Sequence, residues 1–248
     1  MRERVYVIVF MIVLGLVAAI VLTAANSVLK PLYDANKERE AKGNVLIALG
    51  IEGWDKEKVK TATIDEIKAA FRKYIVTVYQ GRELGPDEEL PPKAEADFYV
   101  GYREPGGKGL IGYAFKITGA GFWDRISGYL AVDPPVEKVI GITFYEDYET
   151  PGLGHKINEP EWQEKWLSGL RDPEHPEQRV AVSLYKPGTG APRIDIVAPG
   201  TALAANQVHA LSGATETSGA VQKFMNAQLL KFVEAVTAYK KGQPPSAP

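Results

Sequence analysis

The chain has 248 residues, of which 45% are hydrophobic and 24% charged, and its formal net charge is −2. Such a balance leaves no electrostatic footprint for nucleic acid, so the sequence predicts no nucleic-acid partner. The absence of cysteine excludes disulfides, cysteine-ligated metal centres and a lipid-modified cysteine. Because only three histidines occur, far apart in the sequence, no metal site is expected.

A long apolar run lies close to the N-terminus. Residues 5–25 (VYVIVFMIVLGLVAAIVLTAA) carry no charge, and a helix of that length rises roughly 30 Å, enough to cross a bilayer core. A cleaved signal peptide is the alternative, but its apolar region usually spans only about 7–15 residues. We therefore predict an uncleaved single transmembrane helix, with residues 1–26 as the anchor and its flank. The basic residues on both sides of the run do not decide its orientation.

Two helices are predicted in the region that follows the anchor. Residues 26–51 have a charged middle, which suits a helix leaving the membrane surface. Residues 63–81 form an amphipathic pattern, with Thr63 and Glu66 as a capping box and Gly81 as the stop. The apolar positions of this second helix are Ile64, Ile67, Phe71, Tyr74, Ile75 and Val78. An acidic, proline-containing loop over 82–96 comes next.

Strand-like segments occupy much of the remaining chain. Their apolar side chains alternate, and two of the segments end in Pro-Gly. The predicted strands cover residues 96–104, 137–146, 179–188 and 192–200. A short helix is expected over 158–170, where Asn158 and Glu161 can cap the start and Trp162 and Trp166 share a buried face.

The last predicted helix covers residues 220–242 and has a long apolar stripe. The remaining residues, 243–248 (QPPSAP), read as a disordered tail. Strands and helices mix without regular alternation, which favours the α+β class. We therefore expect one domain of mixed sheet and helix over residues 27–242, after a single transmembrane helix.

A stretch rich in small and hydroxyl residues, ALSGATETSGAV at 210–221, precedes the last helix. Thr217 or Ser218 could be a simple N-cap, because a side-chain oxygen there accepts from free backbone N–H groups. The same helix start could instead bind phosphate, and a neighbouring threonine hydroxyl could carry that phosphate as an ester. No lysine follows the glycines as in a P-loop, and GAGFWD at 119–124 holds only part of a dinucleotide fingerprint.

Several segments together resemble a known family. The SGAT motif at 212–215 followed by ETS, and the ETPGLG loop at 149–154, are similar to motifs of membrane-anchored FMN-binding proteins. That family comprises the C-type subunit of the Na+-translocating NADH:quinone reductase and the G-type subunit of the related Rnf complex. Segments 109–134 and 141–162 also resemble it, and segment 29–50 favours the C-type protein.

The resemblance implies a covalent flavoprotein. In the family, FMN is joined through its phosphate to the final threonine of the motif, here Thr215, and the ETPGLG loop lies against the flavin. The residues implied to surround FMN, besides Thr215, are Ser212, Gly213, Ala214, Thr217, Ser218, Glu149, Thr150, Leu153 and Gly154. His209 departs from the family pattern, which has an aspartate three residues before the serine. In the family, this aspartate is part of the motif that the flavin transferase recognises.

The function implied by the resemblance is electron transfer within a membrane-bound respiratory complex. No catalytic acid, base or nucleophile is predicted, and Trp123 and Tyr129 are expected in the core rather than on the flavin. The implied partners are integral-membrane subunits and a flavin transferase, with the domain on the extracytoplasmic side of a bacterial inner membrane. The alternatives are an Rnf-type protein and a membrane-anchored scaffold without flavin.

Overall fold

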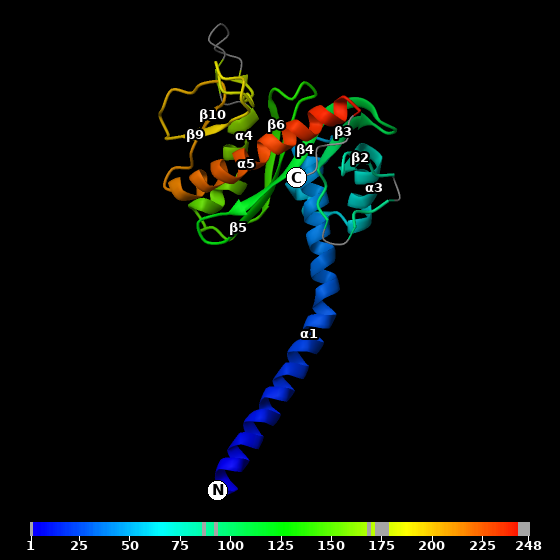
Figure 1. Cartoon of the computed structure of the whole chain (residues 1–248), viewed down its shortest axis with the longest axis vertical. Coiled ribbons are helices and arrows are strands. Elements are labelled where there is room, and N and C mark those ends of the chain that lie inside the picture. The colour runs from blue at the N-terminus through cyan, green and yellow to red at the C-terminus, as the bar shows by residue number, and fades with distance from the viewer. Residues whose placement is uncertain (1, 86–87, 92–93, 168–169, 172–178, 243–248) are drawn as a thin grey trace.

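The protein consists of one mixed helix and sheet domain on a long N-terminal helix (Figure 1). The computed structural model describes residues 2–85, 88–91, 94–167, 170–171 and 179–242. The predicted α+β class with an N-terminal apolar helix is confirmed. The predicted tail at 243–248 lies outside the described residues.

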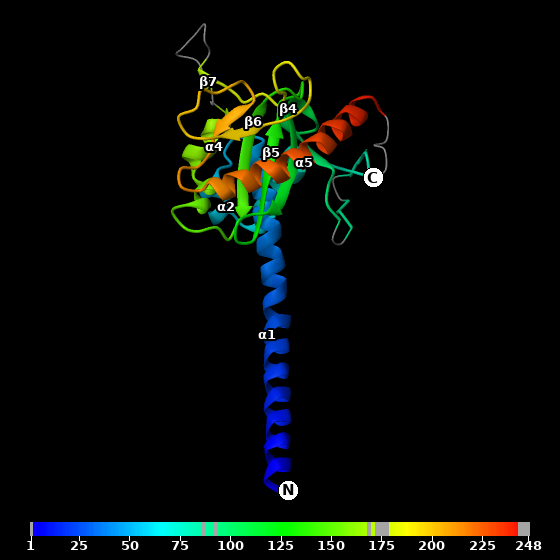
Figure 2. The same ribbon diagram turned by 60° about the vertical axis from the view of Figure 1, so that its left-hand side comes forward.

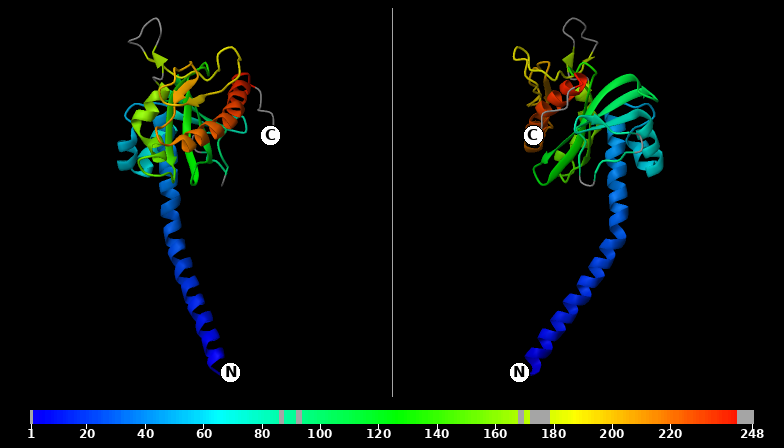
Figure 3. Two further views of the ribbon diagram at one scale, coloured as in Figure 1. Left: turned by 90° about the vertical axis from the view of Figure 1, so that its left-hand side faces the viewer. Right: turned by 45° about the vertical axis from the view of Figure 1, so that its right-hand side comes forward.

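Helix α1 (Arg2–Ala48) is both stalk and core element. Its apolar N-terminal part is fully exposed and is long enough to cross a membrane. Its last turns are buried, with Val45 and Leu46 at 1% and 0% exposure. Figure 3 shows α1 entering the domain without a break, although it bends on the way. Pro31 lies inside this helix, where the missing N–H removes one helical hydrogen bond. The proposed division between residues 26 and 27 thus falls within one continuous helix.

A six-stranded antiparallel sheet forms the centre of the domain, in the order β2-β1-β3-β4-β5-β6. Its strands are β1 (Ile75–Tyr79), β2 (Arg82–Glu83), β3 (Phe98–Glu104), β4 (Lys108–Ala120), β5 (Arg125–Val132) and β6 (Val139–Glu146). The predicted strands at 96–104 and 137–146 are confirmed as β3 and β6. The long β4–β5 hairpin was not predicted, and it supplies the middle of the sheet.

The helix predicted over 63–81 is too long. Helix α3 (Ile64–Tyr74) has the expected Thr63–Glu66 capping box but ends at Tyr74. The next residues, IVTVY, form β1, because β-branched side chains favour an extended backbone. Gln80 and Gly81 then form a two-residue hairpin turn, both with positive φ (49° and 74°). Gly81 therefore ends a strand rather than a helix.

Helices cover both faces of the sheet (Figures 1 and 2). One face packs against α1 and α3, and α2 (Lys56–Thr61) packs against α1. The buried Tyr129 belongs to this side, as expected for a core residue. The other face packs against α5 (Thr215–Lys240) and α4 (Pro160–Leu167). Trp162 and Trp166 are 1% and 0% exposed, which confirms them as core residues.

The segment between α4 and α5 has little regular structure among its described residues. The predicted strand at 179–188 is reduced to β8 (Arg179–Val180), which pairs with β7 (Leu170–Arg171), and to isolated bridges. The predicted strand at 192–200 shortens to β9 (Asp195–Val197), which pairs in parallel with β10 (Gln207–His209). The predicted short helix is preceded by a 3-10 turn, η1 (Gly154–Asn158). There the Asn158 amide donates to Asp147 instead of capping α4.

Candidate functional site

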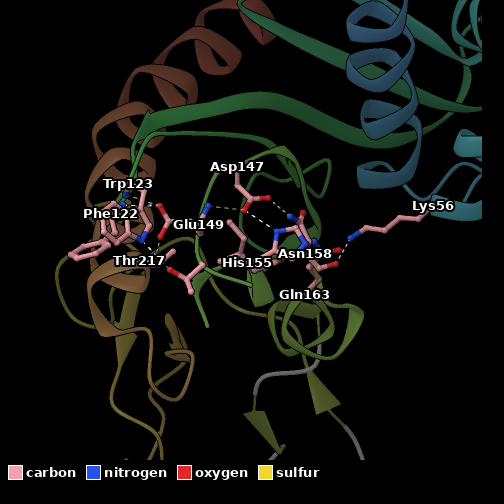
Figure 4. A network of polar contacts seen from close by, with 11 residues as sticks. Lys56, Phe122, Trp123, Asp147, Glu149, His155, Asn158, Gln163 and Thr217 are labelled. Carbon is pink, nitrogen blue, oxygen red and sulfur yellow. Dashed lines mark hydrogen bonds and ion pairs between the residues drawn. The ribbon is translucent and has the colours of Figure 1, made fainter. Parts of the chain in front are cut away.

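Three loops that are distant in sequence meet around one buried carboxylate (Figure 4). Glu149, in the ETPGLG loop after β6, is only 5% exposed. Its Oε1 accepts hydrogen bonds from the backbone N–H groups of Phe122 (2.8 Å) and Trp123 (3.1 Å) in the β4–β5 turn. Its Oε2 accepts a 2.6 Å bond from the hydroxyl of Thr217 in the first turn of α5. Glu149 therefore links the ETPGLG loop to the start of α5, which follows the SGAT motif, and to the β4–β5 turn.

Two glycines make this close approach possible. A Cβ at Gly154 would lie 2.5 Å from the Thr217 hydroxyl and 2.7 Å from Oε2 of Glu149. A Cβ at Gly121 would overlap the other carboxylate oxygen of Glu149. Any side chain at either position would push Glu149 away from its donors. Gly154, which the resemblance implies to lie near FMN, thus leaves room for the contact between Glu149 and Thr217.

The ETPGLG segment folds into a closed turn beside the SGAT motif. The backbone N–H groups of Leu153 and His155 both donate to the Thr150 carbonyl, at 3.1 and 3.2 Å. The Thr150 hydroxyl accepts a 2.9 Å bond from the indole of Trp123. A Cβ on Gly213 (φ 75°) would lie 3.3 Å from the Leu153 side chain. The turn and the motif are therefore direct neighbours.

Helix α5 starts at Thr215, five residues earlier than predicted. The prediction that Thr217 or Ser218 is its N-cap residue is therefore wrong. Its N-cap residue is Ala214, whose side chain makes no cap hydrogen bond. The Thr217 hydroxyl donates to the Glu149 carboxylate, and the Ser218 hydroxyl accepts from the backbone N–H of Leu211 at 3.1 Å. Neither hydroxyl therefore caps the helix. Thr215 is exposed, whereas Thr217 and Ser218 are buried. The helix start thus presents an uncapped positive end beside an accessible threonine hydroxyl.

Exposed apolar side chains border this helix start. Phe122 and Trp123, in the β4–β5 turn, are 55% and 67% exposed and contact each other edge to face at 5.0 Å. Leu153 is 45% exposed. The prediction that Trp123 lies in the core is wrong, because its position in a hairpin turn carries it to the surface. The three side chains form a rim on which a flat aromatic ring system can lie.

A polar network that was not predicted supports the ETPGLG loop from behind (Figure 4). The buried Asp147 carboxylate accepts bonds from the Glu149 N–H (3.2 Å) and the Asn158 amide, and lies 2.9 Å from His155 Nδ1. The Lys56 ammonium, in α2, donates to the Asn158 carbonyl, and burial lowers the pKa of Lys56. The Asp147 to Glu149 bond is the turn that aspartate favours with the residue two positions later, a signal readable in the sequence.

His209, at the position of the expected aspartate, ends β10 and has structural contacts. Its Nε2 lies 2.8 Å from the Thr201 carbonyl oxygen. Its own carbonyl accepts a 2.9 Å bond from the Trp162 indole. The imidazole therefore ties the preceding loop to β10, three residues before the SGAT motif.

Comparisons with known proteins find similar chains. Residues 121–229 match the model of the FMN-binding domain family. The chain is 27% identical over 235 residues to the C-type subunit of the Na(+)-translocating NADH-quinone reductase of Neisseria meningitidis, covering 87% of this chain and 85% of the relative. The corresponding protein from Vibrio vulnificus is 25% identical over 229 residues, covering 84% of each chain.

A solved structure shows the same fold. NqrC of Shewanella oneidensis aligns with a TM-score of 0.60 and 22% identity, over 83% of this chain and 99% of that one. The protein thus has an N-terminal helix that could cross a membrane and a domain that is similar to the FMN-binding domain family over residues 121–229. The predicted likeness to the C-type subunit of the Na+-translocating NADH:quinone reductase is confirmed.

Proposed function

We propose that this chain is the electron-transferring C-type subunit of a Na+-translocating NADH:quinone reductase and carries FMN as a phosphoester on Thr215. The observation that supports this most directly is the exposed Thr215 hydroxyl at the uncapped start of α5, inside the segment that matches the FMN-binding family. An uncapped helix start favours a phosphate group, and an accessible hydroxyl suits a flavin transferase.

Each part of the site has a task in this proposal. The N–H groups at the start of α5 bind the phosphate, while Leu153, Phe122 and Trp123 offer apolar contacts to the ring system. Glu149 holds these three loops in register through its bonds to Phe122, Trp123 and Thr217. FMN, when bound, supplies the redox chemistry, and the chain sets its position and solvent access.

The purified full-length chain, loaded with flavin, should not react with NADH. Hydride transfer from NADH needs a nicotinamide stacked on the flavin, and hence a second nucleotide site, for which the sequence has no complete glycine fingerprint or P-loop. Dithionite should bleach the flavin absorbance, while excess NADH should leave it oxidised in a stopped-flow measurement. Rapid bleaching by NADH would mean that the chain is a stand-alone reductase and not a relay.

Flavin loading should increase when His209 is replaced by aspartate. The proposed reason is that the flavin transferase reads an aspartate at this position in the family. The test is His209→Asp co-expressed with a transferase that serves the usual motif, and the readout is the loaded fraction in intact-mass spectra. Because His209 also holds the Thr201 carbonyl, His209→Asn is the matched control for losing that contact. Equal loading of the wild type and His209→Asp would contradict the hypothesis.

The domain is proposed to face the extracytoplasmic side of a bacterial inner membrane, with other integral-membrane subunits as partners. The apolar, wholly exposed part of α1 supports the anchor. The side is what the resemblance of the sequence motifs to the family implies. Protease added to spheroplasts should therefore cut the domain. Complete protection in spheroplasts, with cutting only in inverted vesicles, would place the domain in the cytoplasm.

A further inference from the structure

A groove of about 1240 Å³ opens where α1 enters the domain. One wall is a single face of α1, the second is α2, and the third runs from the end of β6 to the start of α4. The residues that α1 contributes follow helical spacing: Tyr33, Asn36, Lys37, Glu40, Asn44 and Ile47. Asp147 and His155, which support the ETPGLG loop, belong to the third wall. The groove therefore lies between the stalk and the candidate flavin site.

The groove starts close to the membrane surface. Tyr33 follows the end of the apolar run at Ala25 by eight residues, which corresponds to a rise of about 12 Å in a helix. Asn44 lies further along the same face, about 28 Å from that end. Figures 1 and 3 show the domain around the end of α1 that is farthest from the N-terminus. A segment of a protein embedded in the same membrane can reach the groove along its whole height.

An exposed apolar stripe leads from the membrane into the groove. Val28, Leu29, Leu32 and Tyr33 are 59% to 70% exposed. Tyr33, one turn after Leu29, also lines the groove. The four residues follow the transmembrane run and are separated from it by Asn26 and Ser27. A contiguous apolar stripe in this position marks a contact surface. The stripe thus meets the groove at Tyr33.

The charges that line the groove select a basic occupant. More carboxylates than lysines line it, and the lysines are already engaged: Lys37 with Glu146 (3.7 Å), Lys60 with Glu57 (3.2 Å), and Lys56 with the Asn158 carbonyl. Within the described part of the chain, the carboxylates of Glu40 and Glu159, on opposite walls, have no ion-pair or hydrogen-bond partner. This negative surface attracts lysine or arginine and repels anionic phospholipid headgroups.

We propose that this groove is the docking site for a membrane-adjacent segment of an integral-membrane partner protein, with apolar side chains against the stripe and basic side chains between Glu40 and Glu159. The inference rests on the proposed function, because it requires a multi-subunit complex. It adds the place of contact, which lies directly behind the network that supports the ETPGLG loop. The same contact would fix the height of the flavin site above the membrane.

The absence of native cysteine allows a direct test by single-cysteine labelling in the assembled complex. Asn36→Cys lies in the groove, and Asp34→Cys, exposed at the same height on another side of α1, is the matched control. Because an interface core packs as densely as a protein interior, maleimide labelling of Asn36→Cys should be about tenfold or more slower in the complex than in the detergent-solubilised chain alone. Asp34→Cys should label equally fast in both. Equal labelling of Asn36→Cys in both preparations would overturn the proposal.

The chain alone in vesicles of phosphatidylethanolamine and phosphatidylglycerol distinguishes a partner from the lipid surface. Asn36→Cys should remain fully reactive there. Protection by vesicles alone would assign the groove to the membrane and overturn the proposal.

Charge reversal tests the chemistry of the occupant. Glu40→Lys should lower the amount of chain that co-purifies with the complex about tenfold, because like charges would then meet, whereas Asp34→Lys should have no effect. Flavin fluorescence of the denatured Glu40→Lys chain should be unchanged, which separates this inference from the assignment of Thr215. Wild-type co-purification of Glu40→Lys would contradict a basic occupant.

Discussion

Replacing Thr215 with valine is expected to abolish covalent flavin while leaving the domain folded. Valine keeps the shape of threonine but lacks the hydroxyl, and only an oxygen nucleophile can form the phosphoester. Because Thr215 is exposed at the helix start, the stability should change by only about 0.5 kcal/mol. The measurement is ultraviolet fluorescence of the denatured polypeptide in a gel, after co-expression with a flavin transferase.

Two matched variants sharpen this experiment. Thr215→Ser retains a hydroxyl and should retain some flavin. Thr217→Val removes the buried hydroxyl that donates to Glu149, so it should lower stability but keep the covalent flavin. A fluorescent Thr215→Val chain, or a loss of fluorescence in Thr217→Val alone, would contradict the assignment of the attachment residue.

Replacing Glu149 with alanine is expected to cause the largest loss of stability among the site variants. Alanine would leave the N–H groups of Phe122 and Trp123 and the hydroxyl of Thr217 without their acceptor. Leaving the buried Thr217 hydroxyl and the two partly buried N–H groups without an acceptor, together with the cavity, should cost about 2 to 4 kcal/mol in the free energy of unfolding. Denaturant unfolding of the full chain in detergent, followed by circular dichroism, measures this loss.

The control for this variant is Glu149→Gln, which retains one carbonyl oxygen for the two N–H groups and should lose less stability. A second control is Glu146→Gln, three residues earlier, which removes a partly exposed ion pair with Lys37. Such a pair contributes about 1 kcal/mol at most, so the stability should hardly change. Wild-type stability of Glu149→Ala would mean that this carboxylate does not hold the three loops together.

Local patterns in the sequence predicted the elements whose signals are local. The Thr63–Glu66 capping box, the buried face of Trp162 and Trp166 and the strands β3 and β6 all depend on neighbouring residues, and all are confirmed. The end of α3 was missed because the apolar positions of β1 continue the helical spacing by coincidence. There the β-branched run Ile75–Val78 outweighed the periodicity.

The site was predictable in its parts but not in its assembly. Resemblance and glycine content placed the ETPGLG and SGAT motifs, but the bond between Glu149 and Thr217 joins residues 68 positions apart. No local rule indicates that Thr217, a natural cap residue, donates to a distant carboxylate instead. Trp123 was wrongly predicted in the core because aromatic residues are usually buried. Its exposure follows from its place in the β4–β5 turn, which was not predicted.

Mass spectrometry of the full-length chain co-expressed with a flavin transferase tests the attachment of FMN to Thr215 most directly. Trypsin should release residues 194–223, because no lysine or arginine lies between Arg193 and Lys223. This peptide contains the candidate hydroxyls of Ser212, Thr215, Thr217 and Ser218. We expect a mass increase equal to FMN less one water, located by fragmentation on Thr215. An unmodified peptide from yellow, fully loaded protein, or a modification on another residue, would contradict this attachment.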